Sequence, residues 1–161
     1  MFSPFGNKLA WESMEREGYE SDKNRLFVAD LKTGEKTNFS EGFDQNAHSL
    51  SWGNEGKEIY FISNIHATDE IYRLPLETAE IKRLTDGIHN YQTVQLAGEK
   101  LLAQRVSMSH PAELYVVNPE TGADVQLTAV NDGIMDQLTM GNIEERWLET
   151  TDGKQMQTWV I

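Results

Sequence analysis

The sequence predicts an all-β fold of about three four-stranded antiparallel blades from an incomplete β-propeller. Three observations lead there. Strand-like segments rich in Ile, Val, Leu, Tyr, Phe and Trp alternate with links that carry Gly, Asn, Asp and Pro. The same landmarks recur at a period of roughly 40–50 residues, which is typical of propeller blades. No long segment shows the i, i+3, i+4, i+7 spacing of an amphipathic helix, so helix should be nearly absent.

The clearest unit occupies residues 53–85 and follows a strand that alternates in polarity. Glycine and asparagine in its first turn favour a tight reversal between two apolar strands. The unit therefore predicts four strands, at residues 48–52, 58–63, 70–76 and 81–85. A polar loop at residues 64–69 separates the second strand from the third.

Two other parts of the chain repeat this unit. The turn that leads into an apolar strand recurs at residues 3–11, 53–61 and 97–103. The next strand, each time followed by a turn and a short last strand, recurs at residues 25–31, 70–76 and 113–119. A β-sandwich or a simple meander also contains short, regularly spaced strands, but the recurrence of several landmarks favours the propeller.

The predicted connections divide between two faces of the molecule. In an up-and-down blade, the loop between the second and third strands lies on the same face as the link to the next blade. This long-loop face should carry the polar loops 12–24, 64–69 and 107–112 and the links 40–47, 86–91 and 129–136. Tight glycine turns should close the opposite face. Binding residues are therefore expected on the long-loop face.

The composition excludes several classes of function. Fourteen basic residues against 26 acidic ones give a net charge of −12, which would repel a nucleic-acid backbone. The chain has no cysteine, so disulfides and thiolate nucleophiles are absent. No apolar run approaches the roughly 18–20 residues of a membrane span. We expect no metal, because the histidines lack close ligand spacing, and no cofactor.

After residue 141 the repeat stops. Residues 142–150 and 154–161 read as two strands around an Asp-Gly turn, and both ends of the chain fall within a unit. We therefore expect a fragment of a longer polypeptide. Its blades would occupy residues 3–46, 47–87 and 88–141 within a propeller region 1–141.

The motifs resemble the propeller repeats of the prolyl oligopeptidase/dipeptidyl peptidase IV family of serine peptidases. The matching segments are SPFG at 3–6, WGNEGK at 52–57 and RLTDG at 83–87. Residues 145–161 are similar to the segment where such enzymes leave the propeller. The resemblance covers essentially the whole chain and is strongest for dipeptidyl and acylaminoacyl peptidases. Phe5 and Glu55 replace the usual turn aspartate, and the blade signature is shared with non-enzymatic TolB-like propellers.

The resemblance implies that the chain is the C-terminal part of a peptidase propeller, followed from residue 142 by the crossover to an α/β-hydrolase domain. In the parent enzyme this part would control access of peptides to the catalytic site. The family's serine lies in a G-x-S-x-G turn. That motif does not occur here, so no catalytic residue is expected and the chain should not hydrolyse peptides. The alternative is a TolB-like interaction propeller without enzymatic activity.

Candidate binding residues all fall in or beside the long-loop face. They would line a substrate chamber or contact the hydrolase domain, although solvated loop residues are the simpler interpretation. The candidates are Asp44, His48, His66, His89, Tyr91 and His110. Because three blades cannot close a ring, we also expect dimerisation or domain swapping through exposed blade faces.

Overall fold

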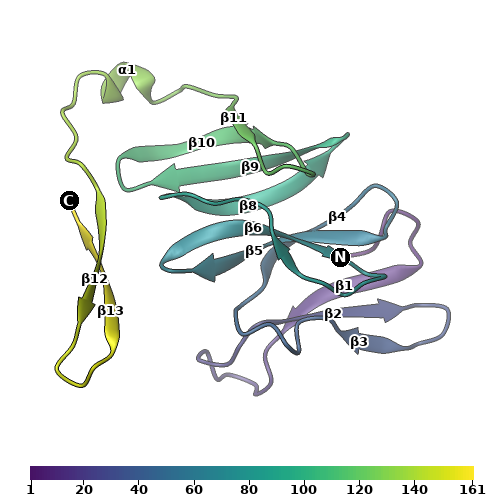
Figure 1. The fold of residues 1–161 in the computed structure, drawn as a ribbon. Coiled ribbons are helices and arrows are strands. Elements are labelled where there is room, and N and C mark those ends of the chain that lie inside the picture. Colours follow the sequence, from purple (N-terminus) through teal and green to yellow (C-terminus); the bar gives the residue numbers. More distant parts are fainter.

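The computed structural model describes residues 1–161 and is almost entirely β, as the sequence predicts (Figure 1). Its centre is a unit of four antiparallel strands. These are β4 (His48–Trp52), β5 (Glu58–Ile65), β6 (Thr68–Pro75) and the two-residue β7 (Lys82–Arg83). Strand β5 pairs with β6 over their full length, from Glu58 opposite Pro75 to Ile65 opposite Thr68.

This middle unit is buried on both faces, because side chains of successive strand residues point to opposite sides of a sheet. Ile59 and Phe61 of β5 belong to one apolar cluster, which also contains residues of the preceding unit. Tyr60 and Ile62 belong to a second cluster, shared with the following unit. Each fully buried side chain of this size contributes roughly 1.5–3 kcal/mol to folding. The two clusters therefore hold the three units together.

The first unit contributes three strands, β1 (Lys8–Ser13), β2 (Arg25–Asp30) and β3 (Lys36–Asn38). An isolated bridge between Phe2 and Leu9 lies beside β1. The inward face of this first unit is apolar, and its residues Ala10, Leu26 and Val28 pack in the first cluster.

The third unit has four strands, β8 (Asn90–Ala97), β9 (Lys100–Ser107), β10 (His110–Val117) and β11 (Asp124–Gln126). It joins the middle unit through one parallel bridge between Asp69 and Asn90, so the two units formally make one eight-stranded sheet. Serine hydroxyls of β4 reinforce the junction. The amides of Val94 and Leu96 donate to Ser49 Oγ (3.1 Å) and Ser51 Oγ (2.8 Å).

The chain then leaves the stacked units. A single helical turn, α1 (Asp132–Met135), precedes a separate hairpin of β12 (Glu144–Glu149) and β13 (Gln155–Val160). Figure 1 shows this hairpin (yellow) standing beside the ends of the stacked strands. No helix in the structure is long and apolar enough to cross a membrane.

Two loops are shorter than the sequence suggests. Residues 64–69 were expected to form a polar loop, but β5 and β6 continue through them and leave only a turn at His66 and Ala67. Residues 107–112 likewise shrink to a turn at Met108 and Ser109. Backbone pairing in a ladder does not require apolar side chains, so polar residues extended these strands. Only the loop of the first unit, between β1 and β2, is long.

The turns on the opposite face repeat closely. Before β3, Asp30 Oδ1 accepts the amides of Lys32 and Thr33 (2.9 and 3.0 Å). Before β11, the side chain of Asn118 does the same for the amides of residues 120 and 121 (2.9 and 3.2 Å). A glycine with positive φ completes each turn, Gly34 (78°) and Gly122 (72°).

These two glycines differ in their surroundings, so replacing each by alanine should destabilise the fold to a different extent. A Cβ atom at Gly34 would meet nothing within 4 Å, whereas one at Gly122 would lie 1.8 Å from the carbonyl oxygen of Leu84 in the neighbouring unit. Gly34→Ala should therefore cost only about 1–2 kcal/mol of backbone strain. Gly122→Ala should cost roughly 3 kcal/mol or more, because a backbone segment must move. Urea unfolding of both variants tests this, and equal losses would contradict the close approach of the two units.

Candidate functional site

The candidate site lies where the β12–β13 hairpin meets the long-loop face of the middle and third units. Gln157 Nε2 donates to the carbonyl oxygen of His66 at 2.6 Å. The indole of Trp147 packs against the His66 ring in an edge-on arrangement, with centroids 5.4 Å apart. Trp147 Nε1 and Gln157 Nε2 both donate to Glu145 Oε1 at 2.9 Å. The hairpin is thus held against the β5–β6 turn by a small polar network.

The β5–β6 turn is itself strained. His66 and Ala67 have φ values of 47° and 59°, the left-handed conformation that a two-residue hairpin turn of this type requires. Asn and Gly usually occupy such positions because other residues pay a steric cost there of roughly 1–2 kcal/mol each. The strained turn presents the His66 carbonyl to the hairpin.

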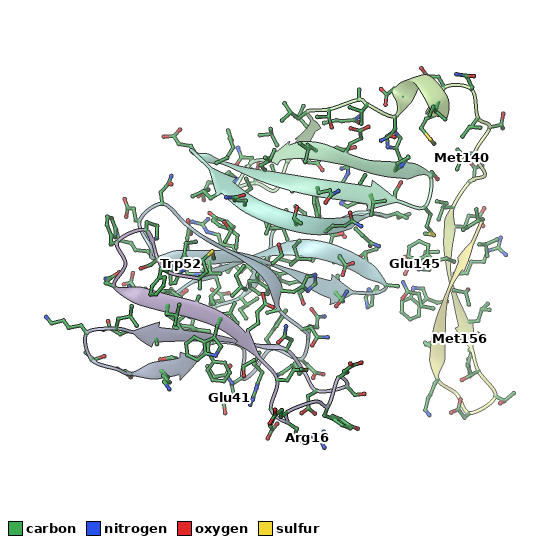
Figure 2. The ribbon with its side chains drawn as sticks, turned by 180° about the vertical axis from the view of Figure 1, so that it is seen from behind. Arg16, Glu41, Trp52, Met140, Glu145 and Met156 are labelled. Atoms are coloured by element: carbon green, nitrogen blue, oxygen red, sulfur yellow. The ribbon has the colours of Figure 1, made fainter.

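A hollow of about 250 Å³ opens between this turn, the link from the middle to the third unit, and the hairpin. Both signs of charge line it. Arg83 Nη2 pairs with Asp86 Oδ1 at 2.9 Å, and Glu145 faces them from the hairpin. In Figure 2, Glu145 lies on the side of the hairpin nearest the stacked strands. Ile65, Ile88 and Trp159 supply the apolar lining.

Two smaller hollows, of about 150 Å³ each, continue along the third unit and share His89, Ile88 and Ser107. One also contains Trp159 and Met108, and the other contains His110 and Arg105. His89 is thus a shared wall of both. Its ring packs edge-on against Tyr91, with centroids 5.0 Å apart.

Beneath His89 lies a fully buried carboxylate, Glu70. Thr85 Oγ1 donates to Glu70 Oε2 at 2.5 Å, while Glu70 Oε1 has no hydrogen-bond partner. Burial raises the pKa of Glu70 to about 7. Burial also lowers the pKa of His89, and the charge of Arg105 lowers it further. Sequence reasoning overlooked Glu70 because it reads as the first residue of a strand.

The structure brings some of the expected site residues together and separates others. His66, His89 and His110 line the hollows of the long-loop face, and Tyr91 contacts His89. His110 Nε2 lies 3.6 Å from Asp132 Oδ1. Asp44 is an exposed residue of the link between the first two units, and His48 begins β4 opposite Ile62. Neither lines these hollows. The part of all six candidates in a substrate chamber or a domain interface stays a prediction.

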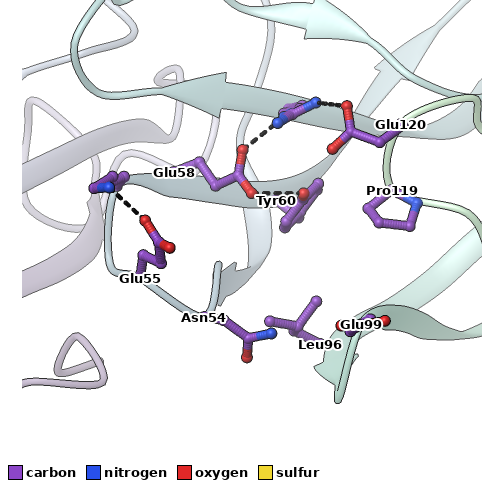
Figure 3. Close-up of a pocket in the computed structure, with 10 residues that line it drawn as sticks. Asn54, Glu55, Glu58, Tyr60, Leu96, Glu99, Pro119 and Glu120 are labelled. Carbon is purple, nitrogen blue, oxygen red and sulfur yellow. Dashed lines mark hydrogen bonds and ion pairs between the residues drawn. The ribbon is translucent and has the colours of Figure 1, made fainter.

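A further hollow, of about 320 Å³, lies on the opposite face between the middle and third units (Figure 3). Its charges are used in holding the units together. Arg73 Nε donates to Glu58 Oε2 at 2.6 Å and Arg73 Nη1 donates to Glu120 Oε2 at 2.7 Å. Tyr60 OH donates to the other oxygen of Glu58 at 2.8 Å. Burial and the nearby carboxylate raise the pKa of Tyr60. We assign this hollow a structural role.

Sequence reasoning missed the residues that connect separate units and the hairpin. Trp147, Trp159 and Gln157 were assigned only to strands. The contacts of Trp147 and Gln157 with His66 span about eighty and about ninety positions of sequence, and Trp159 lines the hollow beside the same turn. Alternation of apolar residues indicates which side of a strand is buried but not which distant loop covers it. No signal in the sequence would have identified the contact.

Comparison with known proteins agrees with this architecture. No family model matches the chain. Dipeptidyl-peptidase 5 of Porphyromonas gingivalis is 44% identical over 160 residues, 99% of this chain and 23% of the relative. An acylaminoacyl peptidase in complex with Z-Gly-Gly-Phe-chloromethyl ketone superposes with a TM-score of 0.77 at 20% identity, over 96% of this chain and 23% of that one. The β-propeller domain of the Trilobed protease from Pyrococcus furiosus superposes with a TM-score of 0.63 at 20% identity, over 79% and 38%.

The similarity to dipeptidyl-peptidase 5 extends through the hairpin, since it covers 99% of the chain. The chain matches a propeller segment of the prolyl oligopeptidase family. It spans about a quarter of the length of that relative. The β12–β13 hairpin follows the three stacked units in the chain, and the assignment of each unit to one blade stays a prediction.

The hairpin carries two adjacent acidic residues, Glu144 and Glu145. Arg146 Nη2 donates to Glu144 Oε2 at 2.6 Å, so the Glu144 carboxylate is paired on the exposed side of the hairpin. Glu145 is engaged by Trp147 and Gln157, as described above. Both carboxylates are thus held by residues of the hairpin itself.

The contact between the β12–β13 hairpin and the turn at His66 can be tested by mutation. Gln157→Ala removes the hydrogen bond to His66, worth about 1 kcal/mol, so amide exchange in β12 and β13 should speed up about threefold to tenfold. Gln155→Ala is the matched control, because Gln155 lies on the same strand and is exposed. Hydrogen exchange of residues 144–160 provides the measurement. Equal rates in the two variants would show that the hairpin is not held through Gln157.

Proposed function

We propose that this chain is the propeller part of a serine exopeptidase of the dipeptidyl or acylaminoacyl type, and that it controls which peptides reach the catalytic domain. The similarity to dipeptidyl-peptidase 5 over the whole chain, hairpin included, carries the proposal. The peptide substrate and the α/β-hydrolase domain would both belong to the parent enzyme. Residues 142–161 would begin the crossover to that domain.

The geometry supports a controlling role for the long-loop face. The opposite face ends in tight turns and in the ion pairs around Arg73. The long-loop face instead carries the hollows lined by His66, His89 and His110. It also carries the exposed loop between β1 and β2, in which Arg16 pairs with Asp22 at 2.5 Å and stacks on Tyr19. A peptide that approached from this face would meet these groups first.

The chain itself should be inactive. It holds no G-x-S-x-G turn, the family's site of the nucleophilic serine. We expect no hydrolysis of dipeptidyl or acylaminoacyl chromogenic substrates by the purified 161 residues, while the parent polypeptide cleaves them. Replacing the β1–β2 loop of the parent by a two-residue turn should increase its rate on longer peptides more than on dipeptidyl substrates.

The activity assay of the chain and the loop replacement in the parent would be contradicted by different results. Cleavage by the isolated chain would contradict the inactive fragment. An unchanged length preference in the loop variant would contradict control of access. A parent whose reading frame encodes no G-x-S-x-G turn would favour the TolB-like interaction propeller instead.

Exposed faces of the outer units support a proposal about assembly. On the outer face of the third unit, Leu102, Val116 and Val125 lie in register across three strands, and Val125 is 71% exposed. On the first unit, Trp11 and Phe27 stack with centroids 5.4 Å apart. Apolar sheet faces of this kind favour self-association.

We therefore expect a concentration-dependent dimer of the chain in light scattering. Val125→Lys should shift the molecule towards the monomer, because a charge would be buried in the contact. Val130→Lys is the control, since Val130 is also highly exposed but lies outside the paired strands. A monomer at every concentration would argue against association through these faces.

A further inference from the structure

The middle and third units carry a buried carboxylate at the same position of the repeat. Glu70 of β6 and Glu113 of β10 are 0% and 2% exposed. Each accepts a hydrogen bond through Oε2 from a threonine hydroxyl, Thr85 or Thr128. Each threonine in turn accepts the backbone amide that follows the glutamate, at 2.9 Å in both units. The local architecture is therefore the same.

The two carboxylates differ at their second oxygen. Glu113 Oε1 accepts both the amide and the side-chain Nδ2 of Asn131 at 2.9 Å. The hydrogen bonds from Thr128 and Asn131 hold the pKa of Glu113 below its usual range. Glu70 Oε1 has no hydrogen-bond partner, although the backbone amide of Gly87 is close enough to lower the pKa of Glu70 slightly against the effect of burial. His89 Nε2 is also unpartnered and lies 3.8 Å from Glu70 Oε2.

No spare positive charge is available to Glu70. The titratable and charged groups around the pair come from β6 and β7, the link, β9, β11 and the hairpin. Arg83 already pairs with Asp86, and Arg105 pairs with Asp124, which also accepts a hydrogen bond from Tyr91. Glu145 of the hairpin adds a negative charge near Arg83 and Asp86. With one proton between them, Glu70 and His89 are neutral together. Without it, the group carries an uncompensated buried negative charge, whichever nitrogen of the imidazole bears its hydrogen.

We propose that Glu70 and His89 form a proton-operated latch, which holds the link of residues 86–89 against β6 while the pair keeps one proton and releases the link when that proton is lost. Protonated, the pair is neutral, and Glu70 and His89 can stay in contact at the observed 3.8 Å between Oε2 and Nε2 although Glu70 Oε1 and His89 Nε2 have no hydrogen-bond partner. Deprotonated, Glu70 requires water, and water enters only if His89 and the link move outward. His89 packs directly on Gly87, where an added Cβ would lie 2.3 Å from the ring, so the link moves with it.

The latch acts on the candidate site directly. Asp86, Gly87 and Ile88 of the link line the 250 Å³ hollow opposite Glu145 and Trp159 of the hairpin. Release of the link would therefore reshape this hollow. An effect on peptide access rests on the proposed function, but the latch itself does not, and it is tested on the chain without any substrate.

The sign of the pH dependence follows from the raised pKa of Glu70. Its ordinary value is 4.5 and its value in the fold is about 7, so the protonated form stabilises the fold fully below 4.5. That stability is lost as pH rises through 7. Glu113, whose pKa is lowered, behaves in the opposite way, since its contribution is lost as pH falls below 4.5.

The experiment is amide hydrogen exchange of the full chain at pH 6.0 and 8.5, corrected for the intrinsic rates. Protection of residues 86–90 should fall about tenfold to thirtyfold at the higher pH, because roughly 1.5 pH units above the pKa shift the equilibrium by that factor. Glu70→Gln keeps a neutral side chain at both values, so the same residues should stay protected. Glu113→Gln is the matched control. It should lose protection near Asn131 and leave the pH response of residues 86–90 intact.

A second measurement needs no variant. Carboxyl carbon resonances should show Glu70 titrating near pH 7 and Glu113 below 4.5. A Glu70 midpoint at or below 4.5 would overturn the latch, as would equal protection of residues 86–90 at the two pH values. Inactivity of the parent as a peptidase would overturn only the proposed function.

Discussion

Burial of the middle unit on both faces is the constraint on which the rest of the structure depends. Successive residues of β5 enter different cores, Ile59 and Phe61 on one side and Tyr60 and Ile62 on the other. A sheet that is apolar on both sides must be covered twice. The first and third units supply those covers, and the packing of both units follows from the alternation along one strand.

The same stacking forces polar groups into the interfaces, where each needs a partner. Ser49 and Ser51 supply acceptors for the amides of β8, and Arg73 joins Glu58 to Glu120 across two units. Because the middle and third units are so similar, a difference between equivalent residues stands out. Glu113 is fully paired and Glu70 is not, although both stand at the same place in their units. The missing hydrogen-bond partner therefore distinguishes Glu70 from its equivalent in the next unit.

The hairpin is joined to this scaffold by few contacts. It contributes nothing to the two apolar clusters and leaves Trp147, Leu148 and Met156 nearly half exposed. Its contacts with the stacked units are few and polar, mainly through Gln157 and Glu145. A pair of strands this exposed is marginally stable alone. The hairpin is therefore held less firmly than the stacked units, which bury their apolar side chains against one another.

The sequence alone determined the repeats, the division into two faces and the two strands of the hairpin, because alternation and turn chemistry are local properties. It also placed His66, His89 and His110 on one face. Only the tertiary structure decided that loop 64–69 is a two-residue turn, and that Glu70 lies buried beneath His89. Strand ends depend on how far a partner strand continues, and a buried pair depends on how two links of the chain approach. Both are set by packing between units, which no local pattern encodes.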